Sequence, residues 1–183
     1  MKNKSLIIIS AVFVLILGVA LLLYPKLSEK AAEAEATTKE NTSISDTVQY
    51  QKYKDIKIFD RNGNEVLLSD FEGKPVILNF WATWCGYCIQ EMPDFEDAYK
   101  KYGSEIEFLM INTDDGIEKG ESFIAGKGYS FPTCYDLEYN AAITYGVSGI
   151  PRTIAIDKDG NIRYNRSGML TAEGLQSIIE MIK

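Results

Sequence analysis

The sequence predicts an α/β domain with a mixed sheet and helices on both faces, preceded by one apolar segment long enough to cross a membrane. Apolar, β-prone runs alternate with stretches of helical spacing from residue 76 onward. Turn signals at Asn62-Gly63 and Asp159-Gly160 add a hairpin on either side of these elements. The apolar segment is the uncharged run from Leu6 to Tyr24. With 183 residues, the chain has room for one domain and an appendage.

Residues 1–24 are predicted to form a transmembrane helix that stays attached as a signal-anchor. The uncharged run is 19 residues long, whereas the apolar core of a signal peptide has about 7–15. Lys2 and Lys4 precede the run, which favours a cytoplasmic N-terminus and an exported body in a bacterial cell membrane. A cleaved signal peptide is the alternative. Residues 25–48, rich in Ala, Glu, Thr and Ser, are predicted to be a linker without a core of its own.

Residues 49–183 are predicted to form the folded domain. We expect an N-terminal hairpin with strands at 54–59 and 65–68, followed by a strand at 76–81, a helix at 88–102 and a strand at 106–112. Next come a helix at 116–128, a short strand at 133–135 and a second helix at 138–145. The domain is expected to end with a hairpin, whose strands are at 153–156 and 162–167, and a last helix that is capped by Thr171 and runs to 182. A net charge of −7 gives no support for nucleic-acid binding. The acidic run Asp94, Glu96 and Asp97 is expected to be a solvated helix face.

Cys85 and Cys88 lie where the strand at 76–81 passes into the following helix. Unpaired N–H groups and the helix dipole favour an anion at a helix N-terminus. We therefore expect a lowered pKa for Cys85 and a nucleophilic thiolate at this position. Cys88, one turn further on, can attack the mixed disulfide and release the partner. The pair and its setting predict thiol–disulfide exchange.

Other uses of two cysteines at this spacing fit the sequence less well. Structural zinc needs four ligands, and the chain has no histidine and one further cysteine, Cys134. Haem attachment needs a histidine directly after the second cysteine, where Ile89 stands. A purely structural disulfide stays open. No metal and no bound cofactor are expected, because the cysteine pair itself carries two electrons. Cys134 is expected to be a buried small hydrophobe.

Three motifs together resemble one family. They are residues 79–88 (NFWATWCGYC), 88–93 (CIQEMP) and 147–151 (VSGIP). They are similar to motifs of the TlpA/ResA-like membrane-anchored thiol–disulfide oxidoreductases, in the thioredoxin superfamily. The likeness covers roughly residues 49–183. It implies a thioredoxin-like fold with an N-terminal β-hairpin extension and a redox-active disulfide between Cys85 and Cys88.

The resemblance also implies roles for residues around the cysteines. Pro151 matches a cis-proline beside the pair, and the backbone of Ile150 is implied to pair with an extended segment of a partner. In cytosolic thioredoxins the position that matches Asn79 is a buried Asp, which shuttles the proton of the second cysteine. The amide of Asn79 cannot do this. Glu91, three residues after Cys88, is therefore expected to be the acid/base for Cys88. The alternative is an ordinary exposed helix Glu.

Aromatic side chains near the cysteines are expected to form a docking surface for partners. Trp84 and Tyr87 are the candidates for substrate binding, while Trp81 belongs either to the same collar or to the core. The chain departs from the family pattern at two places. Gly86-Tyr87 replaces a dipeptide that often carries Pro and looks like the pair in periplasmic disulfide isomerases. Arg152 stands where the family often has Thr.

The expected function is reduction of disulfides in exported proteins by a tethered enzyme on the extracytoplasmic side. By analogy with the family, its clients are of the apocytochrome c or methionine sulfoxide reductase type, and its electrons come from a CcdA-like membrane protein. One alternative is a disulfide-forming oxidant or isomerase, which Gly86-Tyr87 motivates. Another is a non-enzymatic adaptor that uses the disulfide as a staple. A peroxiredoxin fits poorly, because Cys85 lacks the Pro-x-x-x-Thr-x-x-Cys arrangement.

Overall fold

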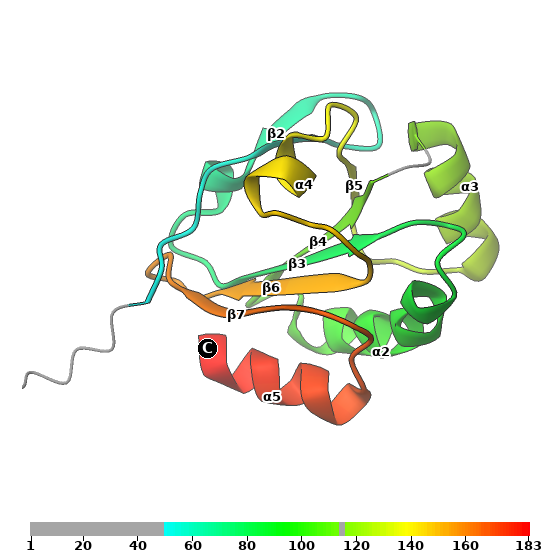
Figure 1. Ribbon diagram of the computed structural model, residues 1–183. Coiled ribbons are helices and arrows are strands. Elements are labelled where there is room, and N and C mark those ends of the chain that lie inside the picture. Colours follow the sequence, from blue (N-terminus) through cyan, green and yellow to red (C-terminus); the bar gives the residue numbers. More distant parts are fainter. Residues whose placement is uncertain (1–49, 114–115) are drawn as a thin grey trace, which may run out of the picture. The chain divides into compact units, whose positions relative to one another are not determined.

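A seven-stranded mixed sheet runs through the computed structural model, which describes residues 50–113 and 116–183 (Figure 1). Its strands lie in the order β2-β1-β5-β4-β3-β6-β7. Their bounds are β1 (Lys57–Phe59), β2 (Glu65–Leu67), β3 (Val76–Trp81), β4 (Glu107–Asn112), β5 (Thr133–Tyr135), β6 (Arg152–Ile156) and β7 (Ile162–Ser167). β3, β4 and β5 are parallel, and the outer strands are antiparallel to their neighbours. The predicted mixed sheet is confirmed.

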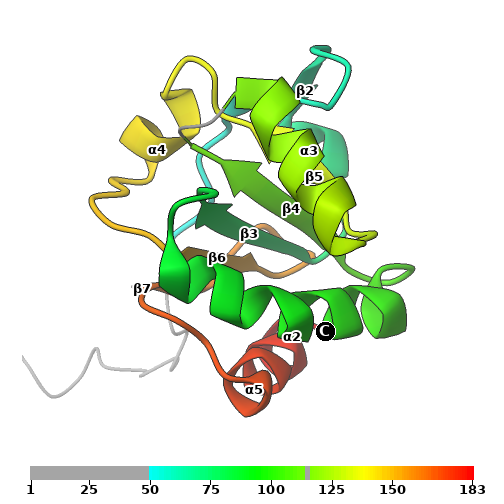
Figure 2. The ribbon, with the colours of Figure 1, turned by 90° about the vertical axis from the view of Figure 1, so that its right-hand side faces the viewer.

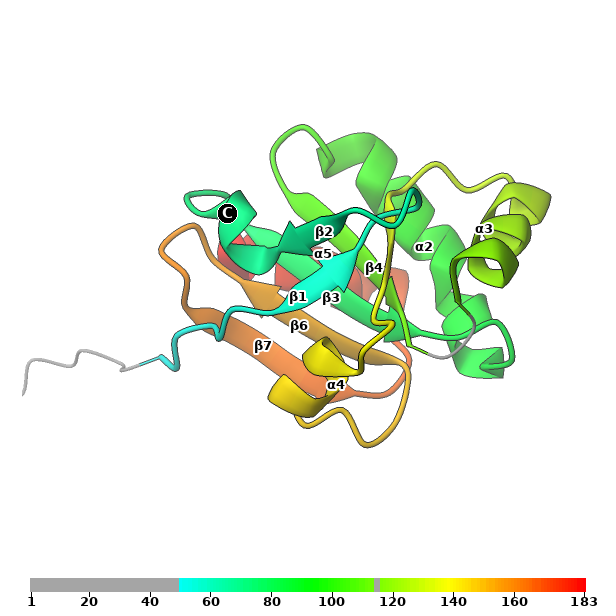
Figure 3. The same cartoon turned by 90° about the horizontal axis from the view of Figure 1, so that it is seen from above.

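Helices cover both faces of the sheet, as the alternation of strands and helices predicts (Figure 2). The helices are η1 (Leu68–Phe71), α2 (Gly86–Tyr102), α3 (Gly116–Lys127), α4 (Asn140–Thr144) and α5 (Ala172–Ile182). α2 and α5 pack on one face, and α4 lies on the other, which faces the viewer in Figure 3. α5 begins as expected, because the Thr171 hydroxyl accepts a hydrogen bond from the N–H of Gly174.

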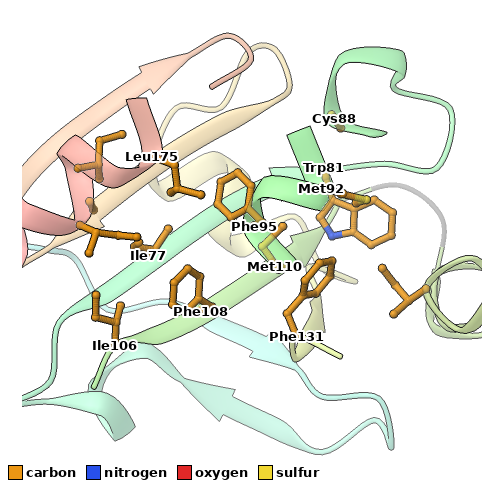
Figure 4. Close-up of a cluster of buried hydrophobic side chains, with 14 of the residues drawn as sticks. Ile77, Trp81, Cys88, Met92, Phe95, Ile106, Phe108, Met110, Phe131 and Leu175 are labelled. Carbon is orange, nitrogen blue, oxygen red and sulfur yellow. The ribbon is translucent and has the colours of Figure 1, made fainter. Parts of the chain in front are cut away.

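The inner strand β3 contributes side chains to two core clusters, one on each face of the sheet. Successive side chains of a strand point to opposite faces. Ile77 and Trp81 therefore join the cluster under α2 and α5, where Figure 4 shows them near Phe95 and Met92. Their neighbours on the strand, Val76, Leu78 and Phe80, join the cluster on the α4 face. Asn79 lies between Ile77 and Trp81 and so faces α2, which makes it a polar residue inside an otherwise apolar buried strand.

Both predicted hairpins form. β1 and β2 make the N-terminal hairpin across a turn in which Gly63 takes the left-handed φ of 80° that a side chain would strain. β6 and β7 make the second, with Gly160 at φ 78°. The expected strand at 54–59 begins only at Lys57, because the backbone of Ile56 pairs with Leu68 at the start of η1. The expected helix at 138–145 begins only at Asn140, because Tyr139 has the left-handed φ of 55°.

Glu96 corrects the expectation that the acidic run of α2 is a solvated helix face. Its side chain is buried, with one carboxylate oxygen accepting hydrogen bonds from the N–H groups of Ser130 (2.8 Å) and Phe131 (3.3 Å). The other oxygen accepts from the Ser130 hydroxyl (2.7 Å) and lies 3.0 Å from Nζ of Lys100. The carboxylate therefore fixes the segment that leads into β5, a contact 34 residues away that helical spacing does not predict.

The described chain enters the domain at the end of the sheet opposite the cysteine pair. The N–H of Tyr53 bonds to Gly160 in the β6–β7 turn, and the ring of Tyr50 lies 4.1 Å from the guanidinium of Arg163. Within residues 50–113 and 116–183, no helix is both long and apolar enough to cross a bilayer. The predicted anchor (1–24) and the predicted linker (25–48) lie outside the described residues.

Candidate active site

Cys85 and Cys88 form a disulfide at the N-terminus of α2. Cys85 is the N-cap residue, and its sulfur accepts a hydrogen bond from the N–H of Cys88 at 3.2 Å. Of the two, Cys85 keeps the more accessible side chain, at 6% exposure against 0% for Cys88. Attack by an outside thiol or disulfide is therefore possible only at Cys85. This order matches the expected division between a nucleophilic and a resolving cysteine.

The strand-to-helix turn places the pair at the edge of the core. β3 ends at Trp81, and the N–H of Cys85 bonds to the carbonyl of Ala82 at 3.1 Å, which closes the turn before α2 begins. Cys88 points into the helix-covered core cluster, near Trp81 and Met92 (Figure 4). Burial of Cys88 protects the resolving thiol from reagents other than its own partner cysteine.

Glu91 lies one helical turn after Cys88 and is 1% exposed, so the alternative of an ordinary surface Glu is wrong. Its Oε1 accepts a hydrogen bond from Nδ2 of Asn79 at 2.8 Å, and its Oε2 accepts one from the N–H of Leu170 at 2.8 Å. Burial raises the pKa of Glu91 to about 7, and the two hydrogen bonds lower it only in part. A carboxyl with this pKa can take up and give back a proton near neutral pH.

Asn79 and Thr153 complete a polar network under α2. Nδ2 of Asn79 donates to Oγ1 of Thr153 at 3.2 Å as well as to Glu91, while Oδ1 of Asn79 has no hydrogen-bond partner. Sequence reasoning missed Thr153 and Leu170. Thr153 follows Pro151 by two residues on a strand, and this period is a signal that could have placed it on the same face. The bond from Leu170 spans 79 residues and has no local signal.

The Ile150–Pro151 peptide bond is cis, as the resemblance implies. β3 and β6 pair with Arg152 opposite Phe80, so the cis bond lies at the same end of the sheet as the turn that carries Cys85. Pro151 is buried and Ile150 half-buried. The carbonyl of Pro151 accepts from the N–H of Gly168 at 2.9 Å, and this bond ties the loop to the segment that holds Leu170.

The aromatic collar contains two of the three expected residues. Trp84 and Tyr87 are 63% and 65% exposed on either side of Cys85. Trp81 is fully buried, and its ring centroid lies 5.7 Å from that of Phe123, so Trp81 belongs to the core. Cys134 is buried in β5, and burial raises the pKa of its thiol to about 12. Such a thiol is unreactive at neutral pH.

Arg152 is engaged by β7 rather than by the cysteine pair. Its Nε donates to Oδ1 of Asn165 at 2.8 Å, and its Nη1 donates to the Ser167 hydroxyl at 3.2 Å. Alternation along β6 puts Arg152 on the face opposite Thr153, away from Glu91. The departure from the family pattern at this position therefore leaves the proton-handling network unchanged.

Comparison with known proteins places this site in a family. A sequence model described as the AhpC/TSA family matches residues 50–165. The thiol-disulfide oxidoreductase ResA of Geobacillus thermodenitrificans is 35% identical over 130 residues, which cover 70% of this chain and 75% of that protein. The ResA of Bacillus subtilis is 32% identical over 125 residues, covering 68% and 70%. The chain belongs to the AhpC/TSA family, as a thiol-disulfide oxidoreductase of the ResA type.

Solved structures agree with this placement. A Chlorobium tepidum protein assigned as a thiol:disulfide interchange protein DsbE superposes with a TM-score of 0.65 at 29% identity, over 72% of this chain and 95% of the other. The fold of this ResA-type protein is thioredoxin-like, as the motifs imply. Its Cys85–Cys88 pair is a redox centre, so the reading as a non-enzymatic adaptor with a structural staple is set aside.

Proposed function

We propose that the chain reduces disulfide bonds of exported proteins on the extracytoplasmic side of a bacterial membrane, to which residues 1–24 tether it. One observation carries the reductive direction: the buried carboxyl of Glu91 lies one turn from Cys88, and residues 81–93 contain no basic side chain. A neighbouring carboxylate disfavours a thiolate. In strongly oxidising members of this fold the reduced form, which carries the thiolate, is stabilised. Residues 81–93 provide no basic side chain that could stabilise a thiolate in this way.

The reaction divides between the two cysteines. The Cys85 thiolate attacks a client disulfide, forms a mixed disulfide and releases one client sulfur as a thiolate. Glu91 then takes the proton of the Cys88 thiol, and the Cys88 sulfur attacks Cys85. The bond between Cys85 and the client breaks, and the electron pair leaves with the client sulfur. Both client sulfurs take up protons from solvent, to which Cys85 and Glu91 have released theirs. Two electrons and two protons thus pass to the client.

The exposed residues around Cys85 fit a protein client. Trp84 and Tyr87 offer aromatic surface on both sides of the nucleophile. The backbone of Ile150 is proposed to pair with an extended client segment. The proposed clients are of the apocytochrome c or methionine sulfoxide reductase type. A CcdA-like membrane protein is proposed to return electrons to the Cys85–Cys88 disulfide after each cycle.

The reduction potential tests the direction. We expect equilibration of the chain with glutathione buffers to give a potential well below about −180 to −210 mV, the poise of an oxidising compartment. A potential above that range would contradict the reductase and support the oxidant that Gly86-Tyr87 motivates. In cells, Cys88→Ala should accumulate mixed disulfides through Cys85, and mass spectrometry of these names the clients. Cys85→Ser is the matched control, and no client should be trapped on it.

A further inference from the structure

Asn79 is a buried amide in the middle of β3, an inner strand of the sheet. Its side chain is 1% exposed and lies between the apolar Ile77 and Trp81 on the face that α2 covers. Burying an amide without full hydrogen bonding destabilises a fold. Yet Oδ1 of Asn79 has no partner, while Nδ2 donates twice, to Glu91 and to Thr153. This unbalanced set of hydrogen bonds is best explained if the Asn79 amide serves to position the Glu91 carboxyl.

The contacts of Glu91 decide which of its oxygens can carry a proton. Oε2 accepts from the backbone N–H of Leu170 at 2.8 Å, and a backbone N–H can only donate. A proton on Oε2 would place two donors against each other. The proton of neutral Glu91 therefore belongs on Oε1, the oxygen that lies 2.8 Å from Nδ2 of Asn79. A proton on Oε1 would point at the NH₂ group of Asn79, which is also a donor, unless the Asn79 amide turns over.

An amide group has a donor and an acceptor at nearly the same distance from its Cγ, and a half-turn exchanges them. After such a turn, Oδ1 of Asn79 accepts the proton on Oε1 of Glu91. The Thr153 hydroxyl either donates or accepts, so it can follow both orientations. The atom without a partner in one orientation becomes the proton acceptor in the other.

We propose that Asn79 is a positioning residue that turns its amide over when Glu91 gains or loses a proton, and so holds the carboxyl in one place in both states. The inference rests on the proposed role of Glu91 toward Cys88. Its consequence is that proton uptake needs no movement of α2 or of the 168–171 segment. The charged neighbours are few: Asp94 on α2 raises the pKa of Glu91, and reduced Cys88 adds a second titrating group there. β3 and the 168–171 segment contain no charged side chain, and Arg152 of β6 lies on the face of the sheet away from Glu91.

Glu91→Gln reproduces the protonated state permanently. The N–H of Leu170 keeps the side-chain oxygen of the new glutamine, and its NH₂ group then points at Asn79, which must accept. The experiment records the side-chain NH₂ resonances of Asn79 in the full-length chain in detergent micelles, labelled with ¹⁵N-asparagine, from pH 5 to 9. In wild-type samples that also carry glutamate labelled with ¹³C at its side-chain carboxyl, the carboxyl carbon of Glu91 is followed over the same pH range. Asp97→Asn, an exposed change on the same helix, is the matched control.

The expected result is a change in the Asn79 resonances at the same midpoint pH as the Glu91 carboxyl carbon. Below that midpoint the wild type should resemble Glu91→Gln, and above it the two should differ. Resonances that stay constant through the midpoint, or that are the same in Glu91→Gln and in the high-pH wild type, would overturn the inference. Asp97→Asn should behave as the wild type does.

A second variant supplies a kinetic reading. Asn79→Leu removes the Nδ2 group that donates to ionised Glu91, so the pKa of Glu91 should rise by about one to two pH units. The pH at which single-turnover reduction of a disulfide peptide reaches half its maximum should rise equally, which means about 10- to 100-fold slower reduction below both midpoints. An unchanged pH profile in a folded variant would contradict the positioning role. If Glu91→Gln reduces the peptide at the wild-type rate, the proposed acid/base role of Glu91 fails instead, whatever the Asn79 resonances do.

Discussion

At the scale of single residues, the physical chemistry of Glu91 links stability and function in opposite directions. Burial moves the pKa of this carboxyl from an ordinary 4.5 to about 7, so its ionised form is disfavoured in the fold. The same shift makes the group useful as a base near neutral pH. A residue kept for chemistry should therefore make the domain less stable at the pH where it works.

The first prediction concerns the pH dependence of this effect. Because the folded pKa lies above the unfolded one, the contribution of Glu91 is fully favourable below about pH 4.5 and is lost as pH rises through about 7. Glu91→Gln removes the titration. The stability of the variant relative to the wild type should therefore increase between pH 4.5 and 8, by about 3 kcal/mol. Denaturant unfolding of the oxidised proteins at both values measures this difference.

A matched surface change separates this effect from general charge removal. Asp97→Asn lies on the same helix, but its side chain is exposed. Its effect on the free energy of unfolding should stay within about 0.5 kcal/mol at either pH. If the gain from Glu91→Gln is the same at pH 4.5 and 8, the carboxyl does not titrate with a raised pKa in the fold.

How far single residues could be read from the sequence depends on the range of their contacts. The spacing of Cys85 and Cys88 at a strand–helix junction predicted the redox pair, since every interaction involved is local. Glu91 needed the family resemblance, because spacing alone does not separate a buried helix Glu from an exposed one. Thr153 and Leu170 were not predicted, since Thr153 reaches Asn79 and Leu170 reaches Glu91 only through tertiary packing.

At the scale of elements, the start of β5 depends on a contact from α2. β5 is three residues long, and Phe131 just before it packs in the core beneath α2 (Figure 4). A strand of three residues makes few backbone hydrogen bonds to its neighbours, so contacts that fix the residues just before it matter for its position. The carboxylate of Glu96 provides it by accepting from Ser130 twice and from Phe131 once. Sequence patterns predicted both elements but not this link between them.

The second prediction is that Glu96→Gln destabilises the domain by about 2–3 kcal/mol at neutral pH, because an amide keeps one acceptor and aims a donor at the others. Burial raises the pKa of Glu96, but the hydrogen bonds from Ser130 and Lys100 outweigh it and hold the pKa below its usual range. The stabilisation is thus present above the unfolded pKa and lost as pH falls through the folded pKa. Thermal unfolding at pH 7 and pH 3 tests both parts.

The same comparison at acidic pH sets the result that would contradict this account. The gap between the wild type and Glu96→Gln should narrow at pH 3, because the stability that the carboxylate contributes is lost as the pH falls from the unfolded pKa of about 4.5 towards the lowered folded pKa. A gap that is independent of pH would mean that the shape of the side chain, rather than its charge, fixes the entry to β5. Lys100→Gln is a useful partner variant, since its Nζ is exposed and its loss should have a much smaller effect.

At the scale of the whole molecule, the described residues contain the redox disulfide, the buried carboxyl of Glu91 and the core that holds them. Both core clusters, the disulfide and the Glu91 network are made by residues from Tyr53 onward. The chain enters at the β6–β7 turn, at the far end of the sheet from Cys85. The point at which the proposed linker joins the domain is therefore not next to the cysteine pair. The proposed anchor and linker would therefore set location without taking part in the reaction.

The last prediction follows from this separation. A chain restricted to residues 49–183 should unfold with the same midpoint as the full chain and reduce insulin disulfides at the same rate, within about twofold, because it keeps both core clusters, the disulfide and the Glu91 network, which residues from Tyr53 onward form. The full chain should sediment with membranes and resist alkaline carbonate, because its 19 uncharged residues from Leu6 to Tyr24 are long enough to span the bilayer. The shortened chain should stay in the supernatant. A full chain that is released by carbonate, or that accumulates in shortened form cut just after the apolar run, would contradict the uncleaved anchor and favour a cleaved signal peptide. A shortened chain that is folded but inactive would instead show that the segment before residue 49 takes part in the reaction.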